Sequence, residues 1–259
     1  MVKTFFKGTI NEKTALQGID LRLEEGDFCT VIGGNGAGKS TLLNSIAGVF
    51  PVDEGSITIN NIDVTKMPEY KRAKYIGRVF QDPMVGTAGN MQIEENLILA
   101  MRRGKNLGLK WAFKDSEQVF FKERLALLGL GLEDRLSARM GLLSGGQRQS
   151  ITLLMATMLR PDLLLLDEHT AALDPKTAEN VLQLTDKLVS EHNLTTLMIT
   201  HNMRDALRFG NRLIMMDAGR IIYDVKGEEK KKLTVADLLQ KFEVAGEGAL
   251  SDRMMLGSK

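Results

Sequence analysis

Apolar and polar residues alternate or gather in short runs along most of the chain, as in a globular protein with both strands and helices. The alternation over residues 15–23 predicts a half-exposed strand, and the apolar run over residues 28–32 predicts a buried one. Leucine and isoleucine then recur at helical spacing over residues 40–49. A glycine-rich turn therefore joins a buried strand to a helix.

This turn fits the phosphate-binding pattern G-x-x-x-x-G-K-[ST], in which backbone N–H groups meet phosphate oxygens at the positive end of a helix. Lys39 would place its charge against the β and γ phosphates, and the Ser40 hydroxyl would bind Mg²⁺. A chance glycine-rich turn is the alternative, and the flanking strand and helix argue against it. The predicted cradle consists of Gly33, Gly34, Asn35, Gly36, Ala37, Gly38, Lys39, Ser40 and Thr41.

Further strands and helices follow the phosphate loop. The run of four leucines at residues 163–166 is typical of a central parallel strand that is buried on both faces. A helix over residues 116–128 should turn Val119, Phe120, Leu125 and Leu128 inward. The other expected elements are a β-ribbon around an Asn-Asn turn at 55–64, helical stretches at 68–74, 93–101 and 175–191, strands at 75–80 and 195–200, a hairpin at 212–225, a solvated charged linker at 227–232, a capped helix at 234–242 and a poorly ordered tail at 246–259.

Composition excludes several classes of protein. A formal net charge of +1 gives no general attraction to nucleic acid, so we expect no nucleic-acid partner. Cys29 is the only cysteine and lies in an apolar strand, which excludes an intramolecular disulfide and predicts a buried thiol. No stretch approaches the ~20 apolar residues that span a bilayer. If the protein works on a membrane, another chain must cross it.

A second predicted anion site lies at residues 143–149, which read L-S-G-G-Q-R-Q. Ser144 is a good helix cap, and Gly145 and Gly146 leave backbone N–H groups bare at the positive end of a helix, where Gln147 follows. The chain therefore has two helix N-termini that are suited to phosphate.

Two carboxylates follow the leucine strand, at the end of a sheet where α/β proteins bind ligands. Asp167 is suited to hold Mg²⁺, and Glu168 is positioned to polarise an attacking water as a general base. A helix-capping acidic pair is the alternative. The Asp-Glu pair follows four leucines and lies shortly downstream of L-S-G-G-Q, which argues against a capping role.

Gln81 and His201 are also expected at strand ends. The amide of Gln81 can coordinate Mg²⁺ or the attacking water, and a neutral His201 imidazole can bond the γ-phosphate and hold water in line with Glu168. A lone glutamine or histidine at a strand end is more often structural, so both roles depend on the surrounding motifs. We expect His192 to be a solvated helix-end residue and, if the strand pattern continues past Glu168, His169 to point away from Glu168.

In this order, the motifs resemble those of the ATP-binding subunit of bacterial ABC transporters, over residues 5 to about 225. The run D-E-H-T-A-A-L-D-P-K at residues 167–176 is similar to a subgroup paired with aromatic-amino-acid-type permeases, although many relatives carry proline where this chain has His169. The elements and this resemblance predict an α/β fold: a P-loop NTPase (RecA-like) core with an antiparallel β subdomain and an inserted α-helical signature subdomain. We expect a single domain over 1–259, with 1–82 and 151–226 as the nucleotide-binding core, 83–150 as the helical subdomain and 227–259 as a C-terminal tail with a short helix.

The resemblance implies ATP and Mg²⁺ as ligands and a head-to-tail dimer, either a homodimer or a pair with a paralogous ATPase subunit. Each ATP would lie between the phosphate loop of one chain and the Ser144 end of the other. Asp174 would couple the two sites across the interface. An aromatic ring, Phe5 or alternatively Phe6, would stack on adenine.

The resemblance also implies that ATP hydrolysis drives an integral membrane permease that imports a small solute such as an amino acid, with a substrate-binding protein acting through the permease. The subunit would be cytoplasmic and peripheral on the inner face of the cell membrane. A groove between Gln81 and Asn96 would receive a permease helix. The basic stretch 102–114 around Trp111 would lie near that permease or lipid headgroups, or form a solvated loop.

A soluble ATPase of the same fold, serving an assembly scaffold, is the rival interpretation. Its partners would be soluble proteins. A P-loop kinase is a third option, but it leaves L-S-G-G-Q unexplained.

Overall fold

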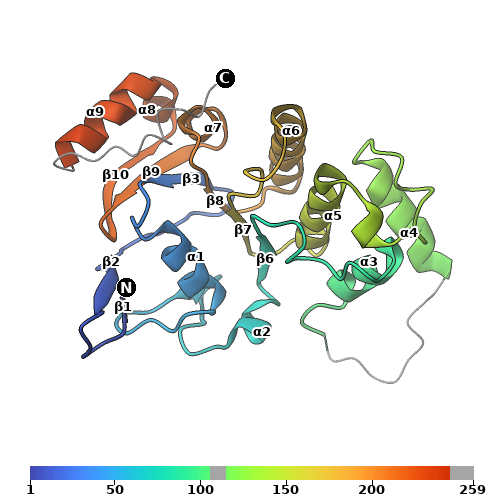
Figure 1. Cartoon of the computed structure of the whole chain (residues 1–259), viewed down its shortest axis with the longest axis horizontal. Helices are drawn as coiled ribbons and strands as arrows, with labels where there is room; N and C mark the ends of the chain where they lie inside the picture. Colours follow the sequence, from blue (N-terminus) through green and yellow to red (C-terminus); the bar gives the residue numbers. More distant parts are fainter. Residues whose placement is uncertain (106–114, 246–259) are drawn as a thin grey trace. The chain divides into compact units, whose positions relative to one another are not determined.

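The computed structural model describes residues 1–105 and 115–245 of the chain. It divides into two compact units: Met1–Arg72 together with the chain from Asn193 onward, and Ala73–His192 (Figure 1). Most of the basic stretch around Trp111 and the whole of the predicted tail at 246–259 lie outside the described residues. The limits proposed above for the nucleotide-binding core and the helical subdomain stay predictions.

The first unit contains a mixed sheet in the order β10-β9-β3-β8. Strand β3 (Phe28–Gly33) is buried throughout and pairs in parallel with β8 (Thr196–Ile199) and β9 (Arg212–Asp217). Strand β10 (Arg220–Lys226) pairs with β9 as the predicted hairpin. Burial raises the pKa of the Cys29 thiol to about 12, which confirms a buried and unreactive cysteine.

Two smaller antiparallel pairs complete the strands of this unit. Strand β1 (Val2–Phe5) pairs with β2 (Lys13–Gln17). The strand predicted over residues 15–23 is therefore wrong beyond Gln17, because Gly18 turns the backbone into the left-handed region with φ 78°. The Asn-Asn turn is confirmed between β4 (Thr58–Ile59) and β5 (Ile62–Asp63), and both asparagines have positive φ.

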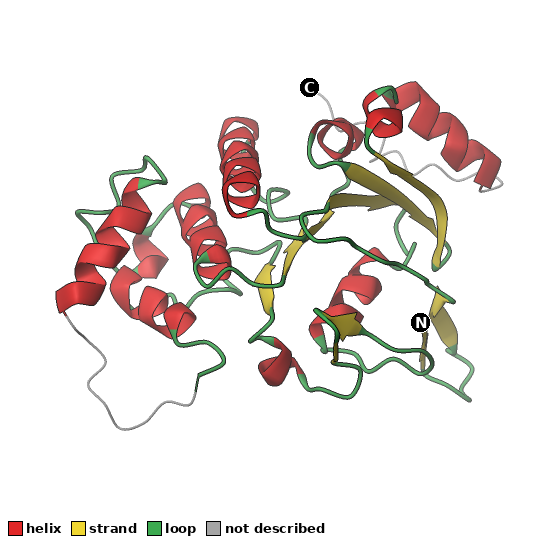
Figure 2. Cartoon of the chain, turned by 180° about the vertical axis from the view of Figure 1, so that it is seen from behind, coloured by secondary structure: helices red, strands yellow, loops and turns green. Residues whose placement is uncertain are grey.

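Helices of the first unit pack against its strands, and the two together form its apolar core. Figure 1 shows α7, α8 and α9 beside β9 and β10, and Figure 2 shows the same helices from behind. Buried side chains of β3, β9, β10, α7 and α9 pack together, among them Ile32, Leu213 and Leu238. The helices are α1 (Lys39–Ala47), α2 (Glu69–Arg72), α7 (Met203–Arg208), α8 (Glu228–Lys231) and α9 (Val235–Ala245).

The charged segment at 227–232 is not the solvated linker that its composition predicts. It forms α8, and Lys230 is only 2% exposed. The Lys230 ammonium donates hydrogen bonds to the carbonyl oxygens of Phe209 and Gly210, just past the end of α7. The predicted cap of the last helix is confirmed, since Thr234 and Asp237 exchange hydrogen bonds at its start.

Arg72 is a fully buried cation that closes the end of α1. Its guanidinium donates to the carbonyl oxygens of Ser45 and Ile46, both at 2.8 Å. Its other donors reach Thr65 at 2.9 Å and Met67 at 2.8 Å. The helix that begins at the phosphate loop is thereby fixed at its far end to the segment after β5.

In its described residues, 73–105 and 115–192, the second unit combines a parallel strand pair with four α-helices. Strand β6 (Ile76–Val79) pairs with β7 (Leu163–Asp167), and the four leucines of β7 are buried as predicted. The helices are α3 (Ile93–Met101), α4 (Asp115–Ala126), α5 (Gly145–Thr157) and α6 (Pro175–His192), with a short 3₁₀ turn, η1, at Met140–Leu142.

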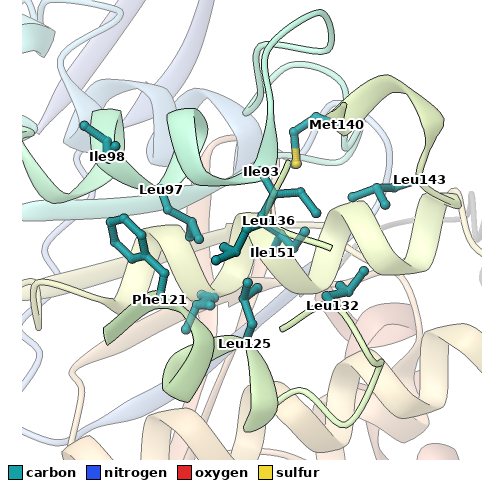
Figure 3. Close-up of a cluster of buried hydrophobic side chains, with 11 residues drawn as sticks. Ile93, Leu97, Ile98, Phe121, Leu125, Leu132, Leu136, Met140, Leu143 and Ile151 are labelled. Atoms are coloured by element: carbon teal, nitrogen blue, oxygen red, sulfur yellow. The ribbon is translucent and has the colours of Figure 1, made fainter. Parts of the chain in front are cut away.

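A separate apolar core joins α3, α4 and α5, and Figure 3 shows Leu97, Phe121 and Leu125 within it. The prediction that Val119 faces inward is wrong, because that side chain is 60% exposed. Phe121 lies four residues before Leu125 and so shares its face of the helix, whereas Val119 does not. None of the helices in the described part of the chain has the length and apolar character needed to cross a bilayer.

Candidate functional site

The predicted phosphate loop connects β3 to α1, as its flanking sequence indicates. Gly38 caps the helix with φ 98°, and no side-chain hydrogen bond caps the first N–H groups of α1. A Cβ on Gly38 would lie 2.6 Å from the carbonyl oxygen of Ala15, and a Cβ on Gly33 would collide with that of Met216. These glycines are required by neighbouring backbone as well as by a phosphate.

Lys39 lies folded into this loop and is only 5% exposed. Its ammonium donates to the carbonyl oxygens of Gly33 at 2.7 Å and Gly34 at 3.1 Å. Asn35, Gly36 and Ser40 are exposed, Gly34, Gly38 and Thr41 are half-buried, and Ala37 is buried. The lysine charge is therefore held within the ring of backbone groups that would meet a phosphate.

His201 lies at the same sheet edge as the phosphate loop. Strands β3 and β8 run in parallel with Val31 opposite Ile199, and the N–H of Thr200 donates to the carbonyl of Val31 at 3.2 Å. His201 follows directly and is half-buried. The structure therefore brings the end of β3 and His201 together within the first unit.

Phe5 ends strand β1 in the same unit. Its ring meets Phe50 edge to face, with ring centroids 5.2 Å apart, and the ammonium of Lys3 lies 5.5 Å from its centroid. Phe6 is 69% exposed and has a φ of 54°. Phe5 is thus the more firmly packed of the two candidate adenine contacts.

In the second unit, Gln81 and Asp167 follow neighbouring parallel strands. Val79 pairs with Leu166, so both strands end at one edge. The carboxylate of Asp167 lies 4.0 Å from the Arg78 guanidinium, which also stacks 4.4 Å from the centre of the Phe80 ring. Gln81 is exposed and Asp167 is half-buried.

The backbone of Glu168 adopts the left-handed region, with φ 46°. This conformation costs a non-glycine residue roughly 1–3 kcal/mol and needs support from its surroundings. The strand ends at Asp167, so the alternation from which His169 was predicted to point away from Glu168 does not continue. The His169 ring is instead buried and hydrogen-bonded to Thr185 of α6 at 3.0 Å, and burial lowers its pKa to about 4.

Ser144 caps α5 as its sequence predicts. The N–H of Gln147 donates to the Ser144 hydroxyl at 3.3 Å, and the Gln147 side chain accepts from the N–H of Ser144 at 3.2 Å. Ser144 and Gly145 are exposed, and a Cβ on Gly146 would collide with Thr177 of α6. The Ser144 end of the helix is therefore open to a ligand on one side and packed on α6 on the other.

Asp174 caps α6 beside the same contact. The N–H of Thr177 donates to its carboxylate at 3.1 Å, and the hydrogen bonds from Thr177 lower the pKa of Asp174. Because Gly146 packs on Thr177, the structure brings the L-S-G-G-Q segment and the Asp174 loop together within the second unit.

Sequence reasoning did not identify Arg148 as part of this site. Its guanidinium is buried and donates to the carbonyl oxygens of Met140 and Gly141, both at 3.1 Å, and of Leu143 at 3.2 Å. It thus fixes the backbone that leads into Ser144. Nothing in a single sequence distinguishes Arg148, or Arg78 beside Asp167, from a solvated arginine.

A phosphate loop between a buried strand and a helix, with carboxylates at the end of a parallel strand, defines a P-loop nucleotide-binding protein. The model of the ABC transporter family matches residues 16–171. The chain is 47% identical to a tyrosine transport ATP-binding protein of Clostridioides difficile, over 90% of this chain and 92% of that protein. It is 34% identical to a methionine import ATP-binding protein of Enterococcus faecalis, over 93% of this chain and 68% of that protein.

Solved structures of ATP-binding cassettes have the same fold as this chain. A dimeric, post-hydrolysis ATP-binding cassette bound to ADP and Pi superposes with a TM-score of 0.72 at 30% identity, covering 87% of this chain and 95% of the other. A nucleotide-free cassette of an ABC transporter superposes with a TM-score of 0.76 at 28% identity, covering 100% and 97%.

The chain belongs to the ABC transporter family, as its ATP-binding subunit, with the P-loop ATPase fold expected from its sequence. It is an ATPase whose hydrolysis of ATP drives a membrane permease. The relatives do not support the rival interpretation of a soluble ATPase that serves an assembly scaffold.

Proposed function

We propose that two copies of this chain, or one copy and a paralogous ATPase subunit, bind two ATP molecules head to tail. The phosphate loop of one chain and the Ser144 end of the other would enclose each triphosphate. Lys39 would leave the carbonyl oxygens of Gly33 and Gly34 and transfer its hydrogen bonds to the β and γ phosphates. The exposure of Ser144 and Gly145 supports this arrangement, because a partner's nucleotide can reach them.

The other residues of the two predicted anion sites, together with Phe5, are proposed to make the remaining contacts to ATP. Asn35, Gly36, Ala37, Gly38 and Thr41 would contribute backbone or hydroxyl donors to the phosphates. Phe5 would stack on adenine, with Phe6 as the alternative, and the Phe50 edge contact would hold the Phe5 ring in place. On the partner side, Gly146 and Gln147 would complete the phosphate contacts, and Asp174 would link the two sites.

The donor set proposed for Mg²⁺ fits the ion. Ser40, Gln81 and Asp167 offer hydroxyl, amide and carboxylate oxygens, and Mg²⁺ prefers a few such ligands together with phosphate oxygens and water. Arg78, 4.0 Å from Asp167, would help to orient that carboxylate. When bound, Mg²⁺ would neutralise charge on the β and γ phosphates.

Glu168 is the proposed general base. It would accept a proton from a water that attacks the γ phosphorus while ADP departs, and His201 would hold the γ-phosphate in line. The observation that carries this assignment is the position of Glu168: it follows Asp167 at the end of a buried parallel strand, in a strained conformation of the kind that clusters at active sites.

The transporter is proposed to be an importer of an amino acid of the tyrosine class. The name of the relative with 47% identity supports this, and so does the resemblance of the run at residues 167–176 to the aromatic-amino-acid-type subgroup. The ATPase would work at the inner face of the cell membrane, on a permease helix received between Gln81 and Asn96, with a substrate-binding protein on the other side. No role for nucleic acid is proposed.

Glu168→Gln tests the base assignment. With ATP and Mg²⁺, this variant should bind ATP, hydrolyse it at least about 100-fold more slowly than the wild type and accumulate as a dimer on size exclusion. Glu191→Gln, which removes a surface carboxylate paired with Lys187 on α6, is the matched control and should hydrolyse normally. Normal turnover by Glu168→Gln would overturn the assignment. The substrate class is tested by the uptake of labelled tyrosine into cells that express the subunit together with the permease encoded next to it in the genome.

A further inference from the structure

The amide of Gln149 joins two backbone segments that border the proposed catalytic residues. Gln149 lies in the first turns of α5 and is completely buried. Its Nε2 donates to the carbonyl oxygen of Phe80 at 3.0 Å and to that of His169 at 2.7 Å. A side-chain NH₂ group has two hydrogens, so this pair of acceptors uses both.

Each acceptor belongs to the residue next to one in the proposed mechanism. The Phe80 carbonyl belongs to the peptide group that contains the N–H of Gln81. The His169 carbonyl belongs to the residue that follows Glu168, whose φ of 46° needs outside support. Gln149 of α5 therefore contacts the Gln81 loop, which is the segment after β6 that begins with Phe80 and Gln81. It holds the start of this loop at a fixed distance from the backbone beside Glu168.

His169 is also held by a residue of α6, Thr185, through its ring. The Thr185 hydroxyl donates its only hydrogen to the carbonyl oxygen of Val181 at 2.8 Å. The Thr185 oxygen must therefore accept from Nε2–H of His169, which assigns the tautomer of that ring. His169 is thus fixed through its carbonyl by α5 and through its ring by α6.

The hydrogen bonding of Gln149 is one-sided. Its Oε1 is buried and has no hydrogen-bond partner within the residues that the structure describes. An unmet buried acceptor destabilises the fold, and an apolar residue of the same size would avoid this. Unlike an apolar residue, Gln149 has two donors, which join the Phe80 carbonyl to the His169 carbonyl.

We propose that Gln149 is a positioning residue: it keeps the Gln81 loop in register with Glu168, so that a displacement of one is passed to the other. This inference rests on the roles proposed above for Gln81 and Glu168. The coupling acts through the backbone of Phe80 and His169.

The test compares Gln149→Met, which keeps the length but removes both donors, with Thr157→Val. Thr157 is buried on the same helix, and within the described residues its hydroxyl donates only to the carbonyls of Leu153 and Leu154. Gln149→Met should lower kcat for ATP about 10- to 100-fold, because small misplacements of catalytic groups have effects of this size. Its KM for ATP should stay within about two-fold of the wild type, since the phosphate loop lies elsewhere in the chain. Thr157→Val should lower the melting temperature without this loss of kcat.

Two further variants keep the test decisive. If Gln149→Met does not fold, Gln149→Leu takes its place, because it also lacks both donors and buries no unpaired polar group; the same loss of kcat is expected. Thr185→Val removes the acceptor for the His169 ring and should also lower kcat. The inference is overturned if Gln149 variants lose no more kcat than Thr157→Val, or if kcat falls only in proportion to the folded fraction. In that case an inactive Glu168→Gln leaves the proposed function standing, whereas an active one overturns the proposed function itself.

Discussion

The ammonium of Lys39 donates to the carbonyl oxygen of Gly33 at 2.7 Å. The charge that is proposed to bind phosphate is thus held by the loop itself. Lys39→Met should weaken ATP binding about 100-fold, because hydrogen bonds from a charged group contribute roughly 1.5–3 kcal/mol each. Equilibrium binding of ATP measures this effect, with Lys187→Met on the surface of α6 as the control. Tight binding by Lys39→Met would contradict the proposed cradle.

The glycines of the loop should differ in their tolerance of a methyl group. Gly38→Ala places a Cβ 2.6 Å from the carbonyl oxygen of Ala15 at a φ of 98°, so we expect it to destabilise the fold by more than about 1 kcal/mol and to weaken ATP binding. Gly34→Ala meets nothing within 4 Å and should leave stability unchanged. Thermal unfolding without nucleotide measures the difference, and equal effects of the two changes would refute this explanation.

Arg72 should matter for stability far more than a typical arginine. Arg72→Met would leave the carbonyls of Ser45, Ile46, Thr65 and Met67 without their buried donor, and we expect a loss of at least about 3 kcal/mol in the free energy of unfolding.

Arg220→Met is the comparison, because that exposed guanidinium bonds only to the Gln17 side chain in the described structure, at 3.1 and 3.2 Å. It should cost less than about 0.5 kcal/mol. Denaturant titration of both variants decides whether the closure of α1 by Arg72 supports the fold.

Protonation of His169 should destabilise the folded chain in mild acid. Its folded pKa of about 4 lies below the ordinary value of 6.5, so between these values the unfolded chain binds more protons. The contribution of the neutral ring is complete above about pH 6.5 and is lost as the pH falls toward 4, on the order of 3 kcal/mol.

Denaturant unfolding at pH 7 and pH 4.5 measures this loss. His169→Asn should show a smaller drop in stability between the two pH values than the wild type, whereas His192→Asn, at the half-buried end of α6, should match the wild type. An identical drop in wild type and His169→Asn would show that another group is responsible.

Local sequence predicted most elements and their chemistry. The Asn-Asn turn and the Ser144 cap depend on contacts within a few residues, and the run of four leucines marks a buried strand by its own composition; the structure contains all three. The exceptions are also local failures with physical causes. A left-handed Gly18 ended a strand early, and α8 forms around the buried side chain of Lys230.

Tertiary structure alone decided which polar side chains support the site. Arg72, Arg148 and Gln149 are buried donors whose acceptors are backbone carbonyls, most of them in other elements. A carbonyl is present at every residue, so no sequence pattern marks the ones that will need a partner.

The sequence by itself determined the family, the nucleotide chemistry and the order of the elements, because those reside in motifs with their own local backbone geometry. Only the folded chain decided that Gln149 lies between Phe80 and His169, and that Ala15 leaves no room for a side chain at Gly38. Such contacts join residues far apart in the chain, and their partners are chosen by packing, which depends on all the elements at once.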